Sequence, residues 1–288
     1  MLYITKPTGS DVNYWAGHHS VMKIGGDIEK YVIKCLKEMQ SSNELHISFT
    51  ISKNDGLENI DVYDEHMNKL EKTTLRIIGT LCTRYVERPN IIYLPLDDDI
   101  FKRGLKDVLS SITNPKWDER IPKAFWRGGT SGGFPSIRTN TVSLLFDYIN
   151  ADVKLTYGDW NINMPIENEH FGDRCSLDKH FKYKYILLID GNLIASNHQW
   201  VFGSGAVPIM ITHPDNNWWF KKMLKPMYNY VPVKYDLSDV KEKIEWLIEN
   251  DDKAKIIMEN AIALSNEILS HQGQCKYIES EIKRIIEI

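Results

Sequence analysis

The sequence has only four cysteines, and no two of them form a CxxC pair. None has a histidine at the spacing of a zinc site, so the chain lacks the usual signature of a structural zinc centre or a redox-active dithiol. Widely spaced thiols of this kind are typical of a reducing, cytosolic compartment. The cysteines are Cys35, Cys82, Cys175 and Cys275.

Long hydrophobic runs are also missing. No window approaches the roughly 18 consecutive apolar residues of a membrane helix. The first residues, MLYITKPTGSDVNYW, lack the basic-then-apolar layout of a signal peptide. We therefore expect a cytoplasmic protein without a membrane span. The net charge of −4 gives no basic footprint, so we expect no nucleic-acid partner.

What the sequence does contain is an alternation of strand and helix patterns over its whole length. Runs such as KYILLID (184–190) and AVPIMIT (206–212) are continuously apolar, which is typical of parallel strands covered on both faces. The alternation predicts an α/β protein. A helix is expected from about 98 to 111, and two more end the chain near 252–269 and 274–287.

The domain boundaries are predicted from composition. The segment TNPKWDERIPK (113–123) has two prolines, several charges and no period, so it is the expected junction. We predict a Rossmann-like domain over residues 1–115, a second over 116–270, and a C-terminal helix over 271–288 that crosses back to the first domain. Ligands of such sheets bind beyond the carboxyl ends of the strands.

The stretch KAFWRGGTSGGFPSIRTN (123–140) is the first candidate site. It fails the Walker A pattern because Phe134 stands where lysine is required, and its glycines do not fit GxGxxG. It predicts a turn of backbone amides leading to a helix N-terminus, with Arg127 and Arg138 nearby, which suits a diphosphate. The alternative is a structural glycine loop whose arginines pair with carboxylates.

Two carboxylate sites are also open. In LPLDDDIFKR (94–103), Asp97, Asp98 and Asp99 follow a strand and could hold a divalent ion; alternatively they cap the next helix. In SKNDGL (52–57), Asp55 ends the alternating strand LHISFTI and could act as a general base; alternatively it is a turn residue before glycine.

Four stretches, taken in order, resemble the Rumi-like protein O-glucosyltransferases, glycosyltransferase family 90, which includes capsule-associated and lipopolysaccharide-modifying enzymes. AFWRGGTSG is similar to the family's "FRGS-x-TS" turn, and SLDKHFKYKYILLIDGN to its "hxxYKYLLxxDG" stretch. IASNHQWVFGSGAVPIM and YNYVPVKYDLSDVKEKIEWLIENDDKA are similar to the segments that follow. ELHISFTISKND resembles the strand that ends in the family's catalytic aspartate.

The resemblance implies a GT-B-type pair of Rossmann-like domains facing across a cleft, and inverting transfer from a UDP-sugar without a required metal or other cofactor. It implies that Asp55 deprotonates the acceptor hydroxyl and that Arg127 holds the diphosphate. The amides of Gly128, Gly129, Thr130 and Ser131 would join Arg127. The acceptor would be a hydroxyl of a glycan or glycoprotein.

One position departs from the family. An ungapped alignment puts Asn197 where the family has an arginine after "DG", between Ser196 and His198. Either His198, Arg138 or a lysine from another loop replaces the missing charge, or the donor binds differently. The compact length and the Ile/Lys/Asn-rich composition resemble viral xylosyltransferases, so xylose is favoured over glucose as the donor sugar. Two alternatives stay open: a metal-dependent transferase that uses Asp97 to Asp99, and an inactive glycan-binding protein.

Overall fold

The computed structural model describes residues 2–5, 27–40, 47–52, 75–80, 82–84, 90–95, 97–132, 135–157 and 165–287. The chain forms two compact units. The first comprises Met1–Gly104, Asn217–Lys222 and Ser270–Ile288, and the second comprises Leu105–Asn216 and Met223–Leu269. None of the described helices is long and apolar enough to cross a membrane.

The first unit is built on a parallel sheet. Its strand order is β1-β2-β3-β5, from β1 (Leu2–Thr5), β2 (Ile47–Ser52), β3 (Leu75–Thr80) and β5 (Ile91–Tyr93). A short pair joins β4 (Cys82–Arg84) to β11 (Asn216–Trp218). The helices are α1 (Asp27–Gln40), α2 (Asp98–Arg103) and α9 (His271–Ile286). Val32 of α1, Ile92 of β5 and Ile278 of α9 are fully buried in one apolar cluster.

The second unit contains a six-stranded sheet in which every neighbouring pair is parallel. The strand order is β12-β10-β9-β6-β7-β8. Numbered within this unit alone, the order reads 6-5-4-1-2-3, which is the doubly wound order of a Rossmann fold. The direction of winding reverses between β6 and β9, so this pair marks the topological switch point. The strands are β6 (Ile121–Gly128), β7 (Ala151–Thr156), β8 (Phe171–Gly172), β9 (Tyr183–Ile189), β10 (Val207–Ile211) and β12 (Val231–Pro232).

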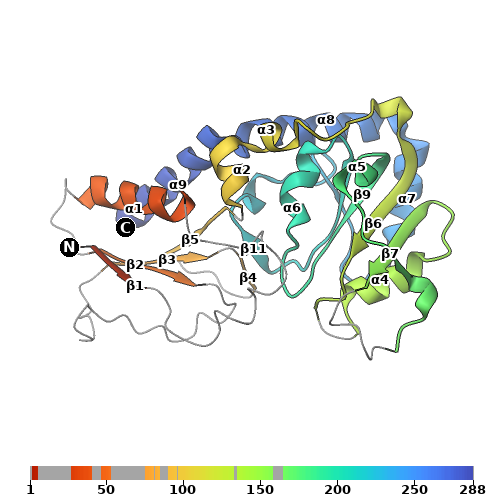
Figure 1. Cartoon of the computed structure of the whole chain (residues 1–288), viewed down its shortest axis with the longest axis horizontal. Coiled ribbons are helices and arrows are strands. Elements are labelled where there is room, and N and C mark those ends of the chain that lie inside the picture. Colours follow the sequence, from red (N-terminus) through yellow and green to blue (C-terminus); the bar gives the residue numbers. More distant parts are fainter. Residues whose placement is uncertain are drawn as a thin grey trace. The chain divides into compact units, whose positions relative to one another are not determined.

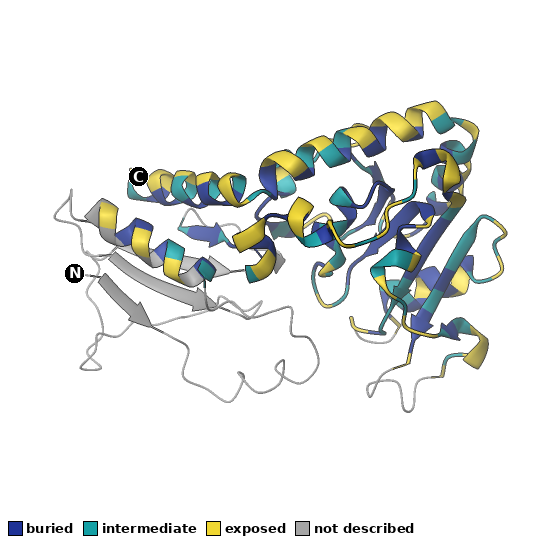
Figure 2. Cartoon of the chain, turned by 45° about the horizontal axis from the view of Figure 1, so that its top comes forward, coloured by how far each residue is buried: buried dark blue, intermediate teal, exposed yellow. Residues whose placement is uncertain are grey.

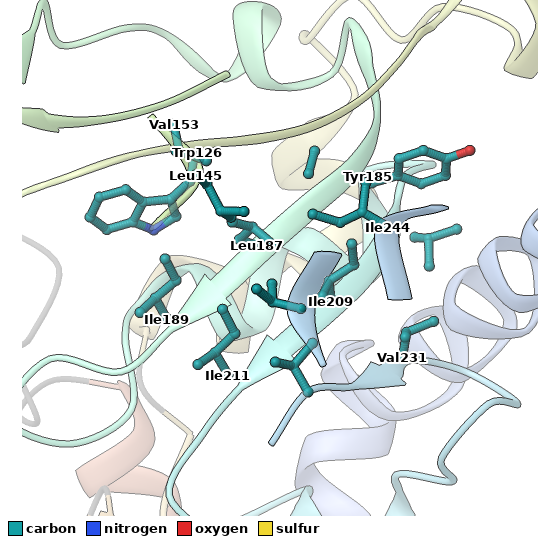
Figure 3. Close-up of a cluster of buried hydrophobic side chains, with 14 of the residues drawn as sticks. Trp126, Leu145, Val153, Tyr185, Leu187, Ile189, Ile209, Ile211, Val231 and Ile244 are labelled. Atoms are coloured by element: carbon teal, nitrogen blue, oxygen red, sulfur yellow. The ribbon is translucent and has the colours of Figure 1, made fainter. Parts of the chain in front are cut away.

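Helices of the second unit cover this sheet (Figure 1). They are α3 (Leu105–Leu109), α4 (Ile137–Leu145), α5 (Leu177–His180), α6 (Asn197–Trp200), α7 (Val240–Glu249) and α8 (Asp251–Ile268). Every residue of β9 is buried, which explains its unbroken apolar run. Figure 3 shows side chains of the strands packed with Leu145 of α4 and Ile244 of α7 in this core, Leu187 and Ile209 among them. Helix α8 presents one buried and one exposed side along its length (Figure 2).

The predicted α/β class is confirmed, since both units are built on parallel sheets. The helix expected from 98 to 111 is instead two helices. Gly104 separates α2 from α3 with φ of 80°, which no helical residue adopts.

The expected junction at 113–123 differs from the boundary in the structure, which lies between Gly104 and Leu105. The charged, proline-containing segment is anchored in the second unit, because Trp117 and Arg120 are buried there. Trp117 Nε1 donates to an Asp251 carboxylate oxygen at 2.9 Å. The C-terminal helix α9 belongs to the first unit, where Gln274 Nε2 donates to the Ile100 carbonyl at 3.0 Å.

Candidate functional site

The candidate site lies at the carboxyl ends of β6 and β9 in the second unit. Residues 129–132 follow β6, and residues 190–192 follow β9. This is the switch point, where open α/β sheets bind their ligands. The structure therefore brings the glycine-rich loop to the edge where the sheet topology predicts a ligand.

In the loop after β6, the backbone is closely packed at Gly132 and has free space beside Gly129. Gly132 has φ of 105° and its amide donates to Asn192 Oδ1 at 3.1 Å, a backbone conformation that favours glycine. A Cβ added to Gly129, in contrast, would meet no atom within 4 Å. Gly133 and Phe134 lie outside the described residues. The loop thus leaves room beside Gly129 for a ligand to approach the backbone.

Helix α4 begins directly after this loop. Ser136 caps it, and its Oγ accepts a hydrogen bond from the Thr139 amide at 3.2 Å. The first turn of a helix carries partial positive charge, which favours an anion nearby. The predicted sequence of strand, amide turn and helix N-terminus is confirmed.

Arg138 joins the two strand ends. Its Nε donates to the Asp190 carbonyl at 2.9 Å and its Nη1 to the Gly129 carbonyl at 3.0 Å. Nη1 also donates to Ser131 Oγ at 2.6 Å, and Nη2 to the Ile189 carbonyl at 3.3 Å. Burial lowers the pKa of Arg138 to about 10, with the Asp190 carboxylate acting in the opposite direction, so the guanidinium is charged at neutral pH. Arg138 places a fixed positive charge at the switch point.

The loop after β9 packs closely on Arg138. A Cβ on Gly191 would lie 2.6 Å from Ser131 Oγ and 3.2 Å from Arg138 Nη2. A side chain at this position would displace the Ser131 hydroxyl that accepts from Arg138, so Gly191 keeps that contact in place. Residues 190–192 are not among the site residues predicted from the sequence. Their signal is a DGN tripeptide directly after a continuously apolar strand.

Asp190 holds the neighbouring strand ends together beneath the site. Its side chain is fully buried, and Oδ2 accepts hydrogen bonds from the His213 amide and from Asn216 Nδ2, both at 2.7 Å. Buried carboxylates need such donors because an unpaired buried charge is costly. Asp190 therefore fixes the ends of β9 and β10 relative to each other.

His198 is fully buried, in contrast to the prediction that it supplies charge to a ligand. Its Nδ1 lies 3.0 Å from the Ala195 carbonyl, and its Nε2 lies 3.2 Å from Thr212 Oγ1. A carbonyl only accepts, so Nδ1 carries the proton, and in the neutral ring Nε2 accepts from Thr212. Burial lowers the pKa of His198 to about 3. A neutral histidine cannot replace the charge that the family arginine would supply.

Arg127 points away from the glycine-rich loop that it precedes. Its Nη2 forms an ion pair with Asp152 Oδ1 of β7 at 2.5 Å, and its Nη1 donates to the Trp126 and Asp152 carbonyls. Tyr183 donates to Asp152 Oδ2 at 2.7 Å. Burial alone would raise the pKa of Asp152, but the hydrogen bonds from Tyr183 and Arg127 lower it overall. Arg127 therefore pairs with a carboxylate of the neighbouring strand, which was the alternative to holding a diphosphate.

Asp152 also lines a cavity of ≈ 360 Å³ whose other walls include Ile121, Lys123 and Lys154. Ile121 begins β6, so this cavity reaches the amino-terminal half of the sheet. It is separate from the loop at residues 129–132. The partner of Arg127 thus faces a different part of the unit from the switch point.

Residues 100–282, well over half of the chain, match the family described as glycosyl transferase family 90.

The chain belongs to glycosyl transferase family 90.

Relatives of this family 90 chain include viral and animal proteins. The chain is 30% identical over 215 residues to the uncharacterized protein 179R of Invertebrate iridescent virus 6, covering 62% of this chain and 18% of that protein. It is 28% identical over 184 residues to human protein O-glucosyltransferase 3, covering 62% of this chain and 35% of that protein. The aligned part thus spans about a fifth to a third of these relatives.

The structure of the chain is similar to that of a glycosyltransferase from Rickettsia africae, with a TM-score of 0.49 and 12% sequence identity. The alignment covers 92% of this chain and 84% of the other.

Asn197, which the sequence resemblance aligns with a family arginine, is half-buried. Asn197 Nδ2 donates to the Leu187 carbonyl of β9 at 3.3 Å. Asn197 Oδ1 is buried, with no partner among the residues that the structure describes. Ser196, just before it, is exposed at the start of α6. Asn197 is therefore bonded to the sheet and supplies no charge, which leaves Arg138 as the cation nearest to the loop in the part of the chain described.

The three aspartates of the metal alternative make contacts of the kind expected for the helix-capping alternative. Asp97 Oδ1 caps α2, accepting from the Asp99 and Ile100 amides at 2.8 and 2.9 Å. Asp98 accepts from the Ile28 amide at 3.1 Å, and Asp99 pairs with Arg103 at 2.9 Å. Each carboxylate serves α2 or its packing, because negative charge is favourable in a first turn. Among the described residues, no group of three His, Cys, Asp or Glu side chains could hold a metal.

Asp55 lies outside the described residues. Strand β2 ends at Ser52, three positions earlier in the sequence. Its role as the catalytic base stays a prediction.

Proposed function

We propose that the chain transfers a sugar from a UDP-sugar to a hydroxyl group of a glycan or glycoprotein, with inversion at the sugar carbon and without an essential metal ion. Membership of glycosyl transferase family 90 supports glycosyl transfer. The two parallel-sheet units agree with a GT-B-type enzyme, in which one domain holds the nucleotide and the other supplies the base. The second unit is the nucleotide-binding one in this proposal.

The observation that carries the proposal is the position of Arg138. Its guanidinium lies between the carboxyl ends of β6 and β9, hydrogen-bonded to Gly129 and Asp190. Beside it are the open side of Gly129 and the N-terminus of α4. A diphosphate bound there would meet a fixed cation, loop amides and the positive end of a helix together.

This set of groups suits a leaving UDP. Negative charge grows on the diphosphate as the bond to the sugar breaks, and preorganised positive charge and amides stabilise that change most. Arg138 is held by four hydrogen bonds, so it would not need to reorganise during the reaction. Positive charge fixed in this way can take the part that a divalent ion has in other transferases.

The acceptor hydroxyl needs a general base on the face of the sugar opposite the leaving group. We assign this role to Asp55, on its resemblance to the family's catalytic aspartate. Among donors, UDP-xylose is favoured and UDP-glucose is next, on the resemblance to viral xylosyltransferases.

A second candidate is a glycan-binding protein that has lost catalysis. The specific observation in its favour is Asn197, which replaces a family arginine and bonds to the sheet. This protein would bind a glycan and show no turnover of any nucleotide sugar.

A donor panel tests the proposal. The full chain is incubated with each common UDP-sugar, with and without EDTA, and slow UDP release is measured. Release from UDP-xylose or UDP-glucose that EDTA does not diminish supports the proposed reaction, and loss in EDTA would contradict its metal independence. No release from any donor, together with glycan binding on an array, would favour the second candidate.

A further inference from the structure

An exposed tyrosine follows β7, the strand next to β6 in the sheet. Tyr157 directly follows Thr156, the last residue of β7, and is 56% exposed. Its ring stacks on Phe171 of β8, with centroids 4.6 Å apart and an interplanar angle of 16°. Phe171 is itself buried in the core. One face of the tyrosine ring is thus fixed by packing, and much of the side chain is open to solvent.

The sheet register places Tyr157 next to the glycine-rich loop. The ladder between β6 and β7 ends with Gly128 opposite Leu155. In sequence, Thr130 lies two residues after the end of β6, and Tyr157 lies one residue after the end of β7. Tyr157 therefore follows the strand next to β6, and the proposed phosphate-binding loop at residues 129–132 follows β6.

We propose that Tyr157 is the stacking platform for the uracil base of the donor. This inference rests on the proposed function, because it requires a UDP-sugar diphosphate on the loop at residues 129–132. In doubly wound sheets the nucleoside joined to the loop phosphate lies over the ends of the first strands, on the side of the second strand. Here those strands are β6 and β7, and Tyr157 is the residue after β7.

The physical chemistry of the ring fits a flat base. Aromatic side chains stack on nucleobases because both present a π face. A ring already stacked on Phe171 loses little conformational freedom when a base covers its other face. Stacking alone does not distinguish one base from another, so Tyr157 is expected to contribute affinity for the nucleoside and little discrimination among bases.

The test is a calorimetric titration of the full chain with UDP and with inorganic pyrophosphate. Tyr157→Ala is expected to weaken UDP binding about tenfold, a typical effect of losing one stacked base. Pyrophosphate binding should be unchanged, and Tyr157→Phe should stay within about twofold of the wild type because the ring remains. Tyr228→Ala is the matched control: Tyr228 is 52% exposed in the same unit and precedes β12.

Each other outcome has a defined meaning. Wild-type affinity for UDP in Tyr157→Ala would overturn the platform while the proposed function stands. An equal loss for UDP and pyrophosphate would overturn it too, because the tyrosine would then act through the loop. A loss confined to UDP-sugars, with UDP unaffected, would place the sugar on the ring and contradict the base assignment. If the wild type binds neither UDP nor any UDP-sugar, the proposed function fails and the platform with it.

Discussion

Arg138 Nε donates a hydrogen bond to the Asp190 carbonyl at 2.9 Å, which ties the helix after β6 to the end of β9. These two strands are neighbours in the sheet although 54 residues separate the last residue of one from the first of the other in sequence. The bond places a charged side chain between the loops that follow β6 and β9. Arg138 and Arg127 lie near the same loop in the sequence, but only Arg138 bonds to the ends of both strands.

The two arginines are expected to behave differently on substitution. Arg138→Gln removes the cation beside the loop and should weaken UDP binding at least tenfold, by about 1.5–3 kcal/mol for a charged hydrogen bond. Arg127→Gln should leave UDP affinity near the wild-type value. It should instead lower the free energy of unfolding by about 2 kcal/mol, because Asp152 loses its partner while staying partly solvated.

Calorimetry with UDP and urea unfolding of both variants check this pair. Arg138→Lys separates the effect of charge from that of geometry, since it keeps the charge and loses the planar fork. The reverse pattern, with UDP binding lost in Arg127→Gln and kept in Arg138→Gln, would restore the diphosphate role to Arg127.

Two glycines at the site should also respond in opposite ways. Gly129→Val adds a side chain whose Cβ meets no atom of the described residues within 4 Å, so the unfolding free energy should change by less than about 1 kcal/mol while UDP binding falls. Gly191→Ala places a Cβ 2.6 Å from Ser131 Oγ and should destabilise the fold by about 1–3 kcal/mol, typical of overpacking. Thermal unfolding and UDP titration of both variants separate the effects. Undiminished UDP binding in Gly129→Val would show that the ligand does not use this side of the loop.

Acid should destabilise the protein through His198. Its folded-state pKa is lowered to about 3, below its unfolded value, so the unfolded chain binds the extra proton first as pH falls. The stability is fully present above the unfolded pKa of about 6.5 and is lost as pH drops from there toward 3, by about 1.4 kcal/mol per pH unit. Between pH 7 and pH 5 the loss from this residue is about 2 kcal/mol.

Urea unfolding at these two pH values checks the prediction, with His198→Asn as the comparison. The variant should be less stable at pH 7 but lose less stability on acidification. Carboxylates with lowered pKa values, such as Asp152, act below this pH window. An unchanged pH dependence in His198→Asn would contradict a neutral, buried histidine.

The catalytic base is tested by Asp55→Asn. Transfer to an acceptor should fall by at least about a hundredfold, the usual contribution of a general base, because an amide cannot take the acceptor proton. UDP affinity should be unchanged, since the diphosphate site proposed here lies in the other unit. Single-turnover transfer and UDP titration measure the two quantities. Full transfer activity in the variant would remove the assignment.

Local patterns predicted much of the second unit. Continuous apolar runs located β9 and β10, and the strand, turn and helix order located the loop before α4. The break at Gly104 and the anchoring of Trp117 were missed, because a positive φ and a contact with Asp251 depend on tertiary structure.

The candidate site was predicted less completely for the same reason. Arg127 and Arg138 both stand near the loop in sequence, but alternation along β6 turns Arg127 toward Asp152 on the neighbouring strand. A polar side chain near a strand end can contact a ligand or bond to the neighbouring strand. Which of the two it does depends on residues far away in the sequence. His198 and Asn197 face Thr212 and Leu187, partners that no local spacing reveals.

The most direct test of the central claim is a crystal structure of the chain with UDP. We predict that the diphosphate binds at the carboxyl ends of β6 and β9, within hydrogen-bond distance of Arg138 and of the backbone amides of residues 129–131. A diphosphate bound at Arg127 and Asp152, or away from the switch point altogether, would contradict it.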